Sequence, residues 1–313
     1  MILPSESLVK ITRRHALALC TAPLIAKSTR ANSTRTVAIT MDDVRWQIIP
    51  DERRADAEAR LLEHLGTTRA FLFAIGNCVD NEHGAKILRN WGAAGHWIGN
   101  HTYSHRALLG AISPEEFELD VLRNDAVLRP YKAFHKWFRF PALKEGQTRA
   151  DRDRLRAFLA QHRYRNGAVT IDASDWYYNE RLLARIQKDP GFDVNLYRSP
   201  YLTHIWDRAQ FYDRLATDVL GRSVCHTLLI HYNLLNALFL GDLLKMFRSN
   251  GWEVIAADEA FSDRVFERRP DTVPAGESLL WALAKETGKF ESRLRYPGED
   301  DVYEKPLIDR LGL

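Results

Sequence analysis

This sequence of 313 residues has little cysteine, no large excess of charge of either sign and no long apolar run. Its three cysteines, Cys20, Cys78 and Cys225, are too few for a disulfide scaffold, and their spacing does not resemble a metal cluster. Cys78 and Cys225 could pair in an oxidising compartment, and the sequence leaves that question open. There are no repeats or low-complexity runs, and a hydrophobic share of 45% is ordinary for a soluble globular enzyme.

The net charge is small and unevenly distributed. The formal value is +3, but residues 1–31 alone carry five basic side chains and one acidic one. The rest of the chain holds 39 basic and 40 acidic side chains. It therefore has no positive excess of the kind that binds phosphates, and we expect no nucleic-acid partner.

The first 31 residues are typical of an export signal. Arg13 and Arg14 precede an apolar run over residues 16–26, and Ala31 supplies a small residue for cleavage. The paired arginines favour the twin-arginine route, and a run of 11 residues is too short to span a bilayer. We expect residues 1–31 to be removed, the protein to be periplasmic or extracellular, and no transmembrane segment. The alternative is a stray N-terminal helix.

From Thr36 onward, strand-like and helix-like patterns alternate. Apolar runs predict strands at 37–41, 70–75, 96–98, 137–140, 168–171, 228–230 and 254–256. Helical patterns include 56–65, 114–129 and 234–249. This alternation implies parallel strands with helices outside, as a barrel or an open sheet.

Local signals refine this organisation. Ser113 followed by Pro114 predicts the start of a helix, with serine as the N-cap. Residues 177–222 predict a helical insertion at one edge of the site. We expect a main domain over residues 34–265 and a C-terminal extension, 266–313, packed on it.

Two histidines and two aspartates indicate a metal site. His101 and His105 lie four residues apart, and imidazole is a common zinc ligand. Asp42 and Asp43 end the run at 37–41, where adjacent carboxylates are costly unless a cation neutralises them. One Asp with two His leaves coordination positions open, which is the catalytic arrangement. Alone, each pair has a plain alternative: an accidental spacing of histidines, or aspartates that cap a turn.

Arg139 lies inside an aromatic stretch. A buried arginine there needs an anionic partner, and Asp42 or Asp43 would serve. The alternative is a surface arginine that covers apolar area.

Two later runs also end in polar residues. The run at 168–171 leads to Asp172, Asp175 and Trp176, and the tryptophan is either a core residue or a platform for a sugar ring. His231 ends the run at 228–230. Because strand C-termini share one face of a parallel barrel, all these residues should converge there.

In this order, the five segments resemble the five motifs of the polysaccharide deacetylase family, carbohydrate esterase family 4. They are Thr-Met-Asp-Asp at 40–43, His-Thr-Tyr-Ser-His at 101–105, Arg-Phe-Pro at 139–141, Asp-Ala-Ser-Asp-Trp at 172–176 and Ile-His at 230–231. The resemblance covers roughly residues 36–261. It implies an α/β fold, a distorted (β/α) barrel, and one divalent metal ion, usually zinc.

The resemblance also implies roles for individual residues. Asp43, His101 and His105 would bind the metal ion. Asp42 would be the general base, held in place by Arg139.

On the other side of the site, the resemblance makes His231 the general acid, oriented by Asp175. A backbone N–H near Ala142 would help to hold the oxyanion, and Trp176, Ala142 and Pro141 would contact the substrate.

Three positions depart from the family pattern. Val44 replaces a glycine, which predicts a different backbone path after Asp43, and Met41 replaces an aromatic residue. Ala142 replaces the aromatic residue that follows the proline, so one wall of the substrate groove is lost. These changes affect the expected substrate more than the catalytic centre.

The expected activity is metal-dependent removal of N-acetyl groups from an amino-sugar polymer or oligosaccharide. One alternative is a hydrolase of another acyl group or of a cyclic amide on the same fold. The other is a carbohydrate-binding relative without turnover, against which Asp42 and His231 together argue, since a binder does not need both.

Overall fold

The computed structural model describes residues 34–107, 112–273, 275–295 and 300–313. The predicted export signal over residues 1–31 lies outside the described residues. Cys78 and Cys225 are both free thiols. Within the described part of the chain, every helix is too short or too polar to cross a membrane.

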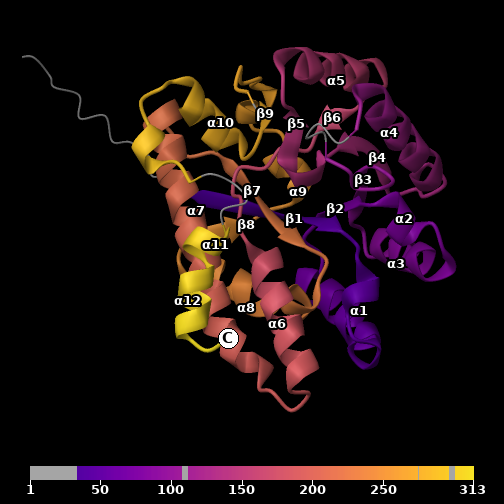
Figure 1. Ribbon diagram of the computed structural model, residues 1–313, viewed down its shortest axis with the longest axis vertical. Helices are drawn as coiled ribbons and strands as arrows, with labels where there is room; N and C mark the ends of the chain where they lie inside the picture. The colour runs from indigo at the N-terminus through magenta and orange to yellow at the C-terminus, as the bar shows by residue number, and fades with distance from the viewer. Residues whose placement is uncertain (1–33, 108–111, 274, 296–299) are drawn as a thin grey trace, which may run out of the picture. The chain divides into compact units, whose positions relative to one another are not determined.

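A parallel sheet of seven strands is surrounded by helices (Figure 1). The strands are β1 (Arg35–Asp43), β2 (Phe71–Ala74), β3 (Trp97–Asn100), β4 (Phe134–Phe138), β6 (Arg165–Asn166), β7 (Cys225–His231) and β8 (Trp252–Val254). Their order is β6-β4-β3-β2-β1-β7, and β8 pairs with the first residues of β1. β1 is central and buried over its last seven residues, as expected for a strand covered on both faces. The predicted α/β class is confirmed.

The sheet curls into a half-barrel, and one short stretch links its two edges. Residues 165–171, called here the closing segment, begin beside β4 and end beside β7. At the first edge the Gly167 N–H donates to the carbonyl of Phe138, and at the second the Leu229 N–H donates to the carbonyl of Ile171. The closing segment therefore brings the two edges of the sheet together.

The long helices follow the predicted pattern. They are α1 (Asp51–Leu65), α3 (Glu82–Ala93), α4 (Pro114–Leu128), α5 (Arg149–Gln161), α6 (Asp175–Lys188), α7 (Arg198–Leu220) and α8 (Leu234–Ser249). Shorter ones are α2 (Gly76–Val79), α9 (Ala257–Ala260), α10 (Leu279–Glu286), α11 (Asp300–Tyr303) and α12 (Lys305–Arg310). The N-cap at Ser113 is confirmed: its side chain accepts from Glu116 N–H, and the Glu116 side chain accepts from Ser113 N–H.

Three strand predictions need correction. The strand predicted at 137–140 ends at Phe138, because the chain then turns into a 3-10 helix at Pro141–Leu143. The stretch at 168–171 forms only one bridge, Ile171 with Leu228, since threonine side chains from Thr170 and Thr227 bond to backbone groups there. The last strand lies at 252–254 instead of 254–256.

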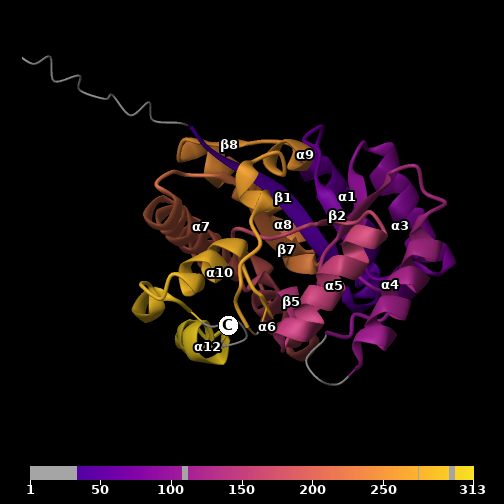
Figure 2. The same ribbon diagram turned by 90° about the horizontal axis from the view of Figure 1, so that it is seen from above.

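The helical insertion and the C-terminal residues lie side by side. α10 packs against α7, and Figures 1 and 2 show α10 and α12 along the same flank of the sheet. Arg181 of α6 pairs with Asp309 of α12 and donates to the carbonyl of Leu313. These contacts place the end of the chain beside the insertion.

A β5–β9 pair, Lys144–Gly146 with Ala275–Gly276, forms a separate antiparallel sheet. It joins the loop after β4 to the segment that precedes α10. That segment contributes Glu277 to the cavity described below.

Candidate functional site

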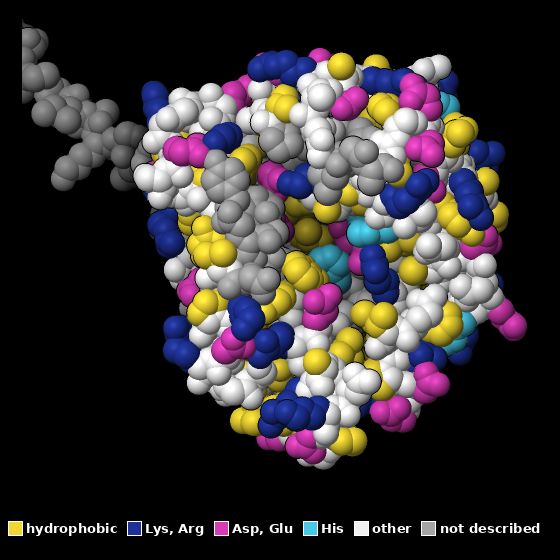
Figure 3. Space-filling model, in the orientation of Figure 1, with side chains coloured by type: hydrophobic (Ala, Val, Ile, Leu, Met, Phe, Trp, Pro, Cys, Tyr) yellow, Lys and Arg dark blue, Asp and Glu magenta, His cyan; other side chains and the backbone are white. Residues whose placement is uncertain are grey.

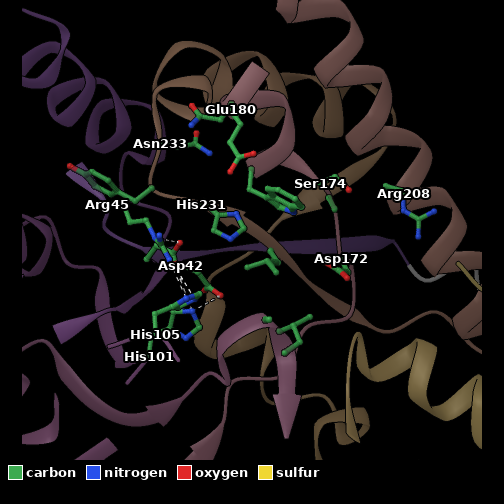
Figure 4. Close-up of a pocket in the computed structure, with 18 of the residues that line it drawn as sticks. Asp42, Arg45, His101, His105, Asp172, Ser174, Glu180, Arg208, His231 and Asn233 are labelled. Carbon is green, nitrogen blue, oxygen red and sulfur yellow. Dashed lines mark hydrogen bonds and ion pairs between the residues drawn. The ribbon is translucent and has the colours of Figure 1, made fainter. Parts of the chain in front are cut away.

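The carboxyl ends of β1, β3 and β7 meet at a cavity of about 610 Å³. Figure 3 shows histidine side chains gathered in a hollow of the surface, and Figure 4 shows that they face one another. All sequence-predicted site residues except Arg139, Asp175 and Pro141 line this cavity. The parallel topology explains the convergence, because successive strands end at the same edge.

Three of these residues form a compact group, called here the triad: Asp43, His101 and His105. Oδ1 of Asp43 lies 3.4 Å from Nε2 of His101 and 3.2 Å from Nε2 of His105. The ligand atoms all lie within 4.8 Å of one another. Asp43 ends β1, His101 follows β3, and His105 follows one turn later in the loop.

The surroundings of the triad suit a divalent metal ion. Oδ1 of Asp43 is buried and has no hydrogen-bond partner among the described residues. Nδ1 of His101 lies 2.8 Å from the carbonyl of Arg139, so Nδ1 carries the proton and Nε2 presents its lone pair to Asp43. Burial by itself raises the pKa of Asp43, but the nearby histidines lower it well below its usual range. An ionised carboxylate with two imidazoles is a donor set that zinc accepts.

Asp42, the neighbour of Asp43, is held by Arg139. Nη1 of Arg139 donates to Oδ1 of Asp42 at 2.9 Å, and its other groups donate to Gly167 O and Thr40 Oγ1. Arg139 is 1% exposed and Asp42 is 3% exposed. A buried ion pair of this kind needs further hydrogen bonds, and each of the three guanidinium nitrogens of Arg139 donates one. Of the two partners that the sequence left open, the structure pairs Arg139 with Asp42.

Gly167 allows Arg139 to take this position. The guanidinium of Arg139 lies 4.2 Å from the centre of the Phe73 ring, and the same ring fills the space beside Gly167. A Cβ atom at Gly167 would lie 2.3 Å from Cζ of Phe73. A side chain at this position would therefore displace the ring on which Arg139 rests.

Across the cavity, Asp175 anchors His231. Oδ1 of Asp175 lies 2.8 Å from Nδ1 of His231, and Oδ2 accepts from the backbone N–H of His231 at 2.9 Å. Asn233 and Asn236 also donate to Oδ2, and Asp175 is fully buried. This carboxylate therefore fixes the ring of His231 with Nδ1 protonated and Nε2 free to exchange a proton.

The charge state of His231 follows from these neighbours. Burial on its own lowers the pKa of His231, but the carboxylate of Asp175, with smaller effects from Asp43 and Asp42, raises it to about 10. His231 is then protonated at neutral pH, as a proton donor must be.

The three residues predicted to contact substrate differ in position. Trp176 is 38% exposed and lines the cavity, which fits a platform and not a core residue. Ala142 is also exposed and lines the cavity. Pro141 is buried and does not line it. Pro141 instead starts the 3-10 turn that presents Ala142.

Left-handed backbone is concentrated in the loops around the triad. The non-glycine residues concerned are Asp43 (φ 83°), Val44 (64°), Thr102 (62°), His105 (59°), Ala142 (50°) and Leu143 (57°). For a β-branched residue such as Val44 this is costly, and such strain persists only where the surrounding structure imposes it. The backbone after Asp43 therefore takes a glycine-like path without a glycine.

Sequence reasoning missed several residues of the site. Arg45 donates from Nε to Oδ2 of Asp43 at 2.9 Å, and its Nη2 lies 3.1 Å from Nδ1 of His105. Its place two residues after the aspartate pair was the available signal. Asn233 and Asn236 lie two and five residues after His231, where polar residues after a buried strand could have indicated donors to a carboxylate. The insertion over residues 177–222 was expected at one edge of the site, but no residue within it, such as Arg208, was singled out. Arg295 of the C-terminal extension was not singled out either.

Comparison with known proteins finds a family model that matches part of this chain. Residues 29–165 match the family model described as polysaccharide deacetylase. A comparison with curated protein sequences finds no match.

Several solved structures are similar to this chain. A CE4 family pseudoenzyme from Bacillus anthracis is 16% identical, with 74% of this chain and 66% of that chain covered and a TM-score of 0.51. A mutant of that protein with restored enzymatic activity is 17% identical, with 74% and 68% covered and a TM-score of 0.51. A peptidoglycan deacetylase from Bacillus subtilis is 18% identical, with 83% and 96% covered and a TM-score of 0.47. At 16% and 17% identity, the similarity to the Bacillus anthracis structures is evidence for a shared fold alone.

Proposed function

Since residues 29–165 match the polysaccharide deacetylase family model, we propose that this chain is a metal-dependent hydrolase of N-acetylated amino sugars. Its substrate would be an amino-sugar polymer or oligosaccharide, and its products acetate and the free amine. The observation that carries the proposal is the arrangement around the triad. Asp42, held by Arg139, lines the same cavity as the triad. His231, held by Asp175, lines it as well.

Asp43, His101 and His105 would hold one divalent ion, which we take to be zinc. When bound, the ion would supply Lewis-acid chemistry, polarising the acyl carbonyl and making a water molecule more acidic. Asp42 would accept the proton of that water as general base. Arg139 orients this carboxylate and balances its charge, because its guanidinium donates to Oδ1 in a buried setting.

His231 would act as general acid. Cleavage of an amide expels an amine, so a proton must reach the nitrogen as the carbon–nitrogen bond breaks. The proton would come from Nε2 of His231, since Nδ1 is engaged by Asp175. The raised pKa of His231 supports this role, because it keeps the ring protonated at neutral pH.

The walls of the cavity would hold the sugar. Trp176 offers an exposed ring on which a pyranose could stack. Ala142, with its left-handed backbone, would present an N–H toward the oxyanion, and Pro141 would act by fixing this turn.

We further propose that residues 34–265 form the catalytic domain and residues 266–313 an extension packed on it. Glu277 and Arg295 of the extension line the cavity, which supports that packing. Residues 1–31 would direct export to the periplasm or the medium.

A second candidate is a carbohydrate-binding protein without turnover. Its support is the similarity in fold to a CE4 family pseudoenzyme. A binding protein would not require both a held carboxylate at Asp42 and a protonated His231.

One experiment distinguishes the hydrolase from the carbohydrate-binding protein. The purified protein, analysed for bound metal, is incubated with chitin oligomers, peptidoglycan fragments and N-acetylglucosamine polymers, and acetate release is measured. Asp42→Asn is the control, because it keeps the triad and removes the base. Acetate release by the wild type that is lost in Asp42→Asn supports the hydrolase. Binding of the sugars with no acetate release by a metal-loaded wild type would favour the pseudoenzyme.

A further inference from the structure

Arg208 is a buried arginine on the side of the cavity remote from the triad. It belongs to α7, is 9% exposed and lines the cavity together with Tyr212, one turn later. Figure 4 shows Arg208 across the cavity from His101 and His105. A guanidinium with so little access to water needs a counter-charge, because desolvating a cation is costly.

The other lysine and arginine side chains considered on or beside the cavity have carboxylate partners. The pairs are Arg45 with Asp43, Arg139 with Asp42, Lys144 with Glu277, and Arg295 with Glu304. Burial lowers the pKa values of Arg139 and Lys144, and the charge of Asp172 opposes that shift in both. The described part of the chain provides no carboxylate in an ion pair with Arg208.

Aromatic rings hold Arg208 in position instead. Its guanidinium lies 4.6 Å from the ring centre of Phe211 and 5.1 Å from that of Tyr212. Such contacts orient a cation but do not neutralise it. Its charge also acts on nearby groups: burial, with the charges of Arg208 and Arg295, lowers the pKa of His204 to about 3. His204 is therefore neutral at pH 7.

We propose that Arg208 binds an oxyanion on the substrate, a carboxylate or phosphate group carried by the amino sugar. This inference rests on the proposed function and narrows its substrate to acidic N-acetylated sugars. The planar guanidinium matches either group with two parallel hydrogen bonds. One cavity of about 610 Å³ joins Arg208 to the triad, a size suited to a sugar that reaches both.

Three matched sugars test the proposal: N-acetylglucosamine, its 3-O-lactyl ether N-acetylmuramic acid, and N-acetylglucosamine 6-phosphate. Acetate release gives kcat/KM, and calorimetry gives Kd for each sugar with the zinc-loaded protein. The wild type should prefer one or both acidic sugars by about 10- to 100-fold, mainly through KM and Kd. Whether the lactyl ether or the phosphate is favoured identifies the oxyanion.

The variants are Arg208→Gln, Arg208→Lys and, as a matched control on the same helix, Arg214→Gln. Arg214 is exposed, and its side chain donates a hydrogen bond to Gln210. Arg208→Gln should abolish the preference for acidic sugars, Arg208→Lys should retain part of it, and Arg214→Gln should retain all of it. If Arg208→Gln fails to fold, Arg208→Lys decides, because lysine keeps the charge but not the planar two-bond geometry. A reduced preference for acidic sugars supports the role of Arg208, and an unchanged preference overturns it.

The outcomes separate this proposal from the function on which it rests. Equal binding of neutral and acidic sugars by the wild type, or a preference that survives Arg208→Gln, overturns the role of Arg208 and leaves the deacetylase proposal intact. Binding of acidic sugars that depends on Arg208 without acetate release overturns the deacetylase and retains the oxyanion site.

Discussion

Arg45 donates to Oδ2 of Asp43 at 2.9 Å, while Oδ1 of the same carboxylate faces His101 and His105. The guanidinium thus competes with a cation for Asp43 and adds positive charge beside the triad. Arg45→Gln should therefore bind zinc more tightly, by about two- to fivefold, a modest effect because the Arg45 side chain is 44% exposed. Competition titration against a chelating dye measures this affinity.

The control for this prediction is Arg60→Gln, which removes an exposed arginine that pairs with Asp56. Its zinc affinity should equal that of the wild type. Weaker zinc binding by Arg45→Gln would show that the arginine supports the site instead of competing for it.

His231→Ala should keep its metal and its substrate affinity but lose turnover. A positioned general acid contributes about 10²–10⁴-fold, so kcat on an N-acetylated amino sugar should fall by that amount. The loss should be much smaller on an aryl acetate, whose leaving group scarcely needs a proton. Equal losses on the two substrates would remove His231 from the acid role.

Asp175→Asn should move the alkaline limit of activity. Burial lowers the pKa of His231 and the charge of Asp175 raises it to about 10, so removal of that charge should bring the pKa down. The protonated acid is then lost at lower pH, and kcat should decline at least one pH unit earlier than in the wild type. A pH profile of kcat with unchanged circular dichroism measures this, and an unmoved alkaline limb would contradict it.

Gly167→Ala should destabilise the protein and lower its activity together. The added Cβ would lie 2.3 Å from Phe73, and overpacking of a core typically costs about 1–3 kcal/mol. Because the guanidinium of Arg139 packs on that ring, a shift of the ring should also displace Arg139 from Asp42. Gly191→Ala is the control, since its Cβ would lie 3.6 Å from Asp189. Urea unfolding and kcat should change in Gly167→Ala only.

His96 should make stability depend on pH. Burial, with a smaller effect of Arg69, lowers the pKa of His96 to about 4 from an ordinary 6.5. Between about pH 6.5 and pH 4, His96 therefore binds a proton in the unfolded chain but stays neutral in the folded state. Its contribution to the free energy of unfolding is present above about pH 6.5 and falls by up to about 3 kcal/mol as the pH drops to about 4.

Urea unfolding of the wild type and His96→Gln at pH 7 and pH 4.5, both with chelator, checks this. The wild type should lose more stability than the variant between the two pH values. Identical losses would mean that other histidines account for the acid sensitivity.

The sequence was a good guide to elements whose pattern is local. The run at 37–41 predicted β1 because consecutive apolar residues mark a strand covered on both faces, and the Ser113 cap depends on residues three apart. The stretch at 168–171 is similarly apolar but forms only a single β-bridge, between Ile171 and Leu228. Its role depends on the curl of the sheet, which no local pattern encodes.

The same contrast holds for the site. Asp42, Asp43 and His101 were recognisable because they end or follow apolar runs, where parallel strands converge, and His105 by its spacing of four residues from His101. Arg208 lies in the middle of a helix, and Arg295 follows a short 3-10 turn near the chain end. Nothing in their local sequence indicates that α7 and α10 pack together and bring them to the cavity.

The closing segment also has a consequence for the order in which the chain assembles. It carries Gly167, whose carbonyl accepts from Arg139, and it leads directly to Asp175. The triad lies within residues 43–105, whereas Arg139 reaches Asp42 across 97 residues of sequence, and His231 reaches the site only when β7 pairs with β1. Contacts between segments this far apart in sequence form late, because loop closure must precede them. A folding intermediate with β1, β2 and β3 already paired would therefore hold the triad while Asp42 and His231 were still without their partners. Such a species could capture a metal ion before it could catalyse anything.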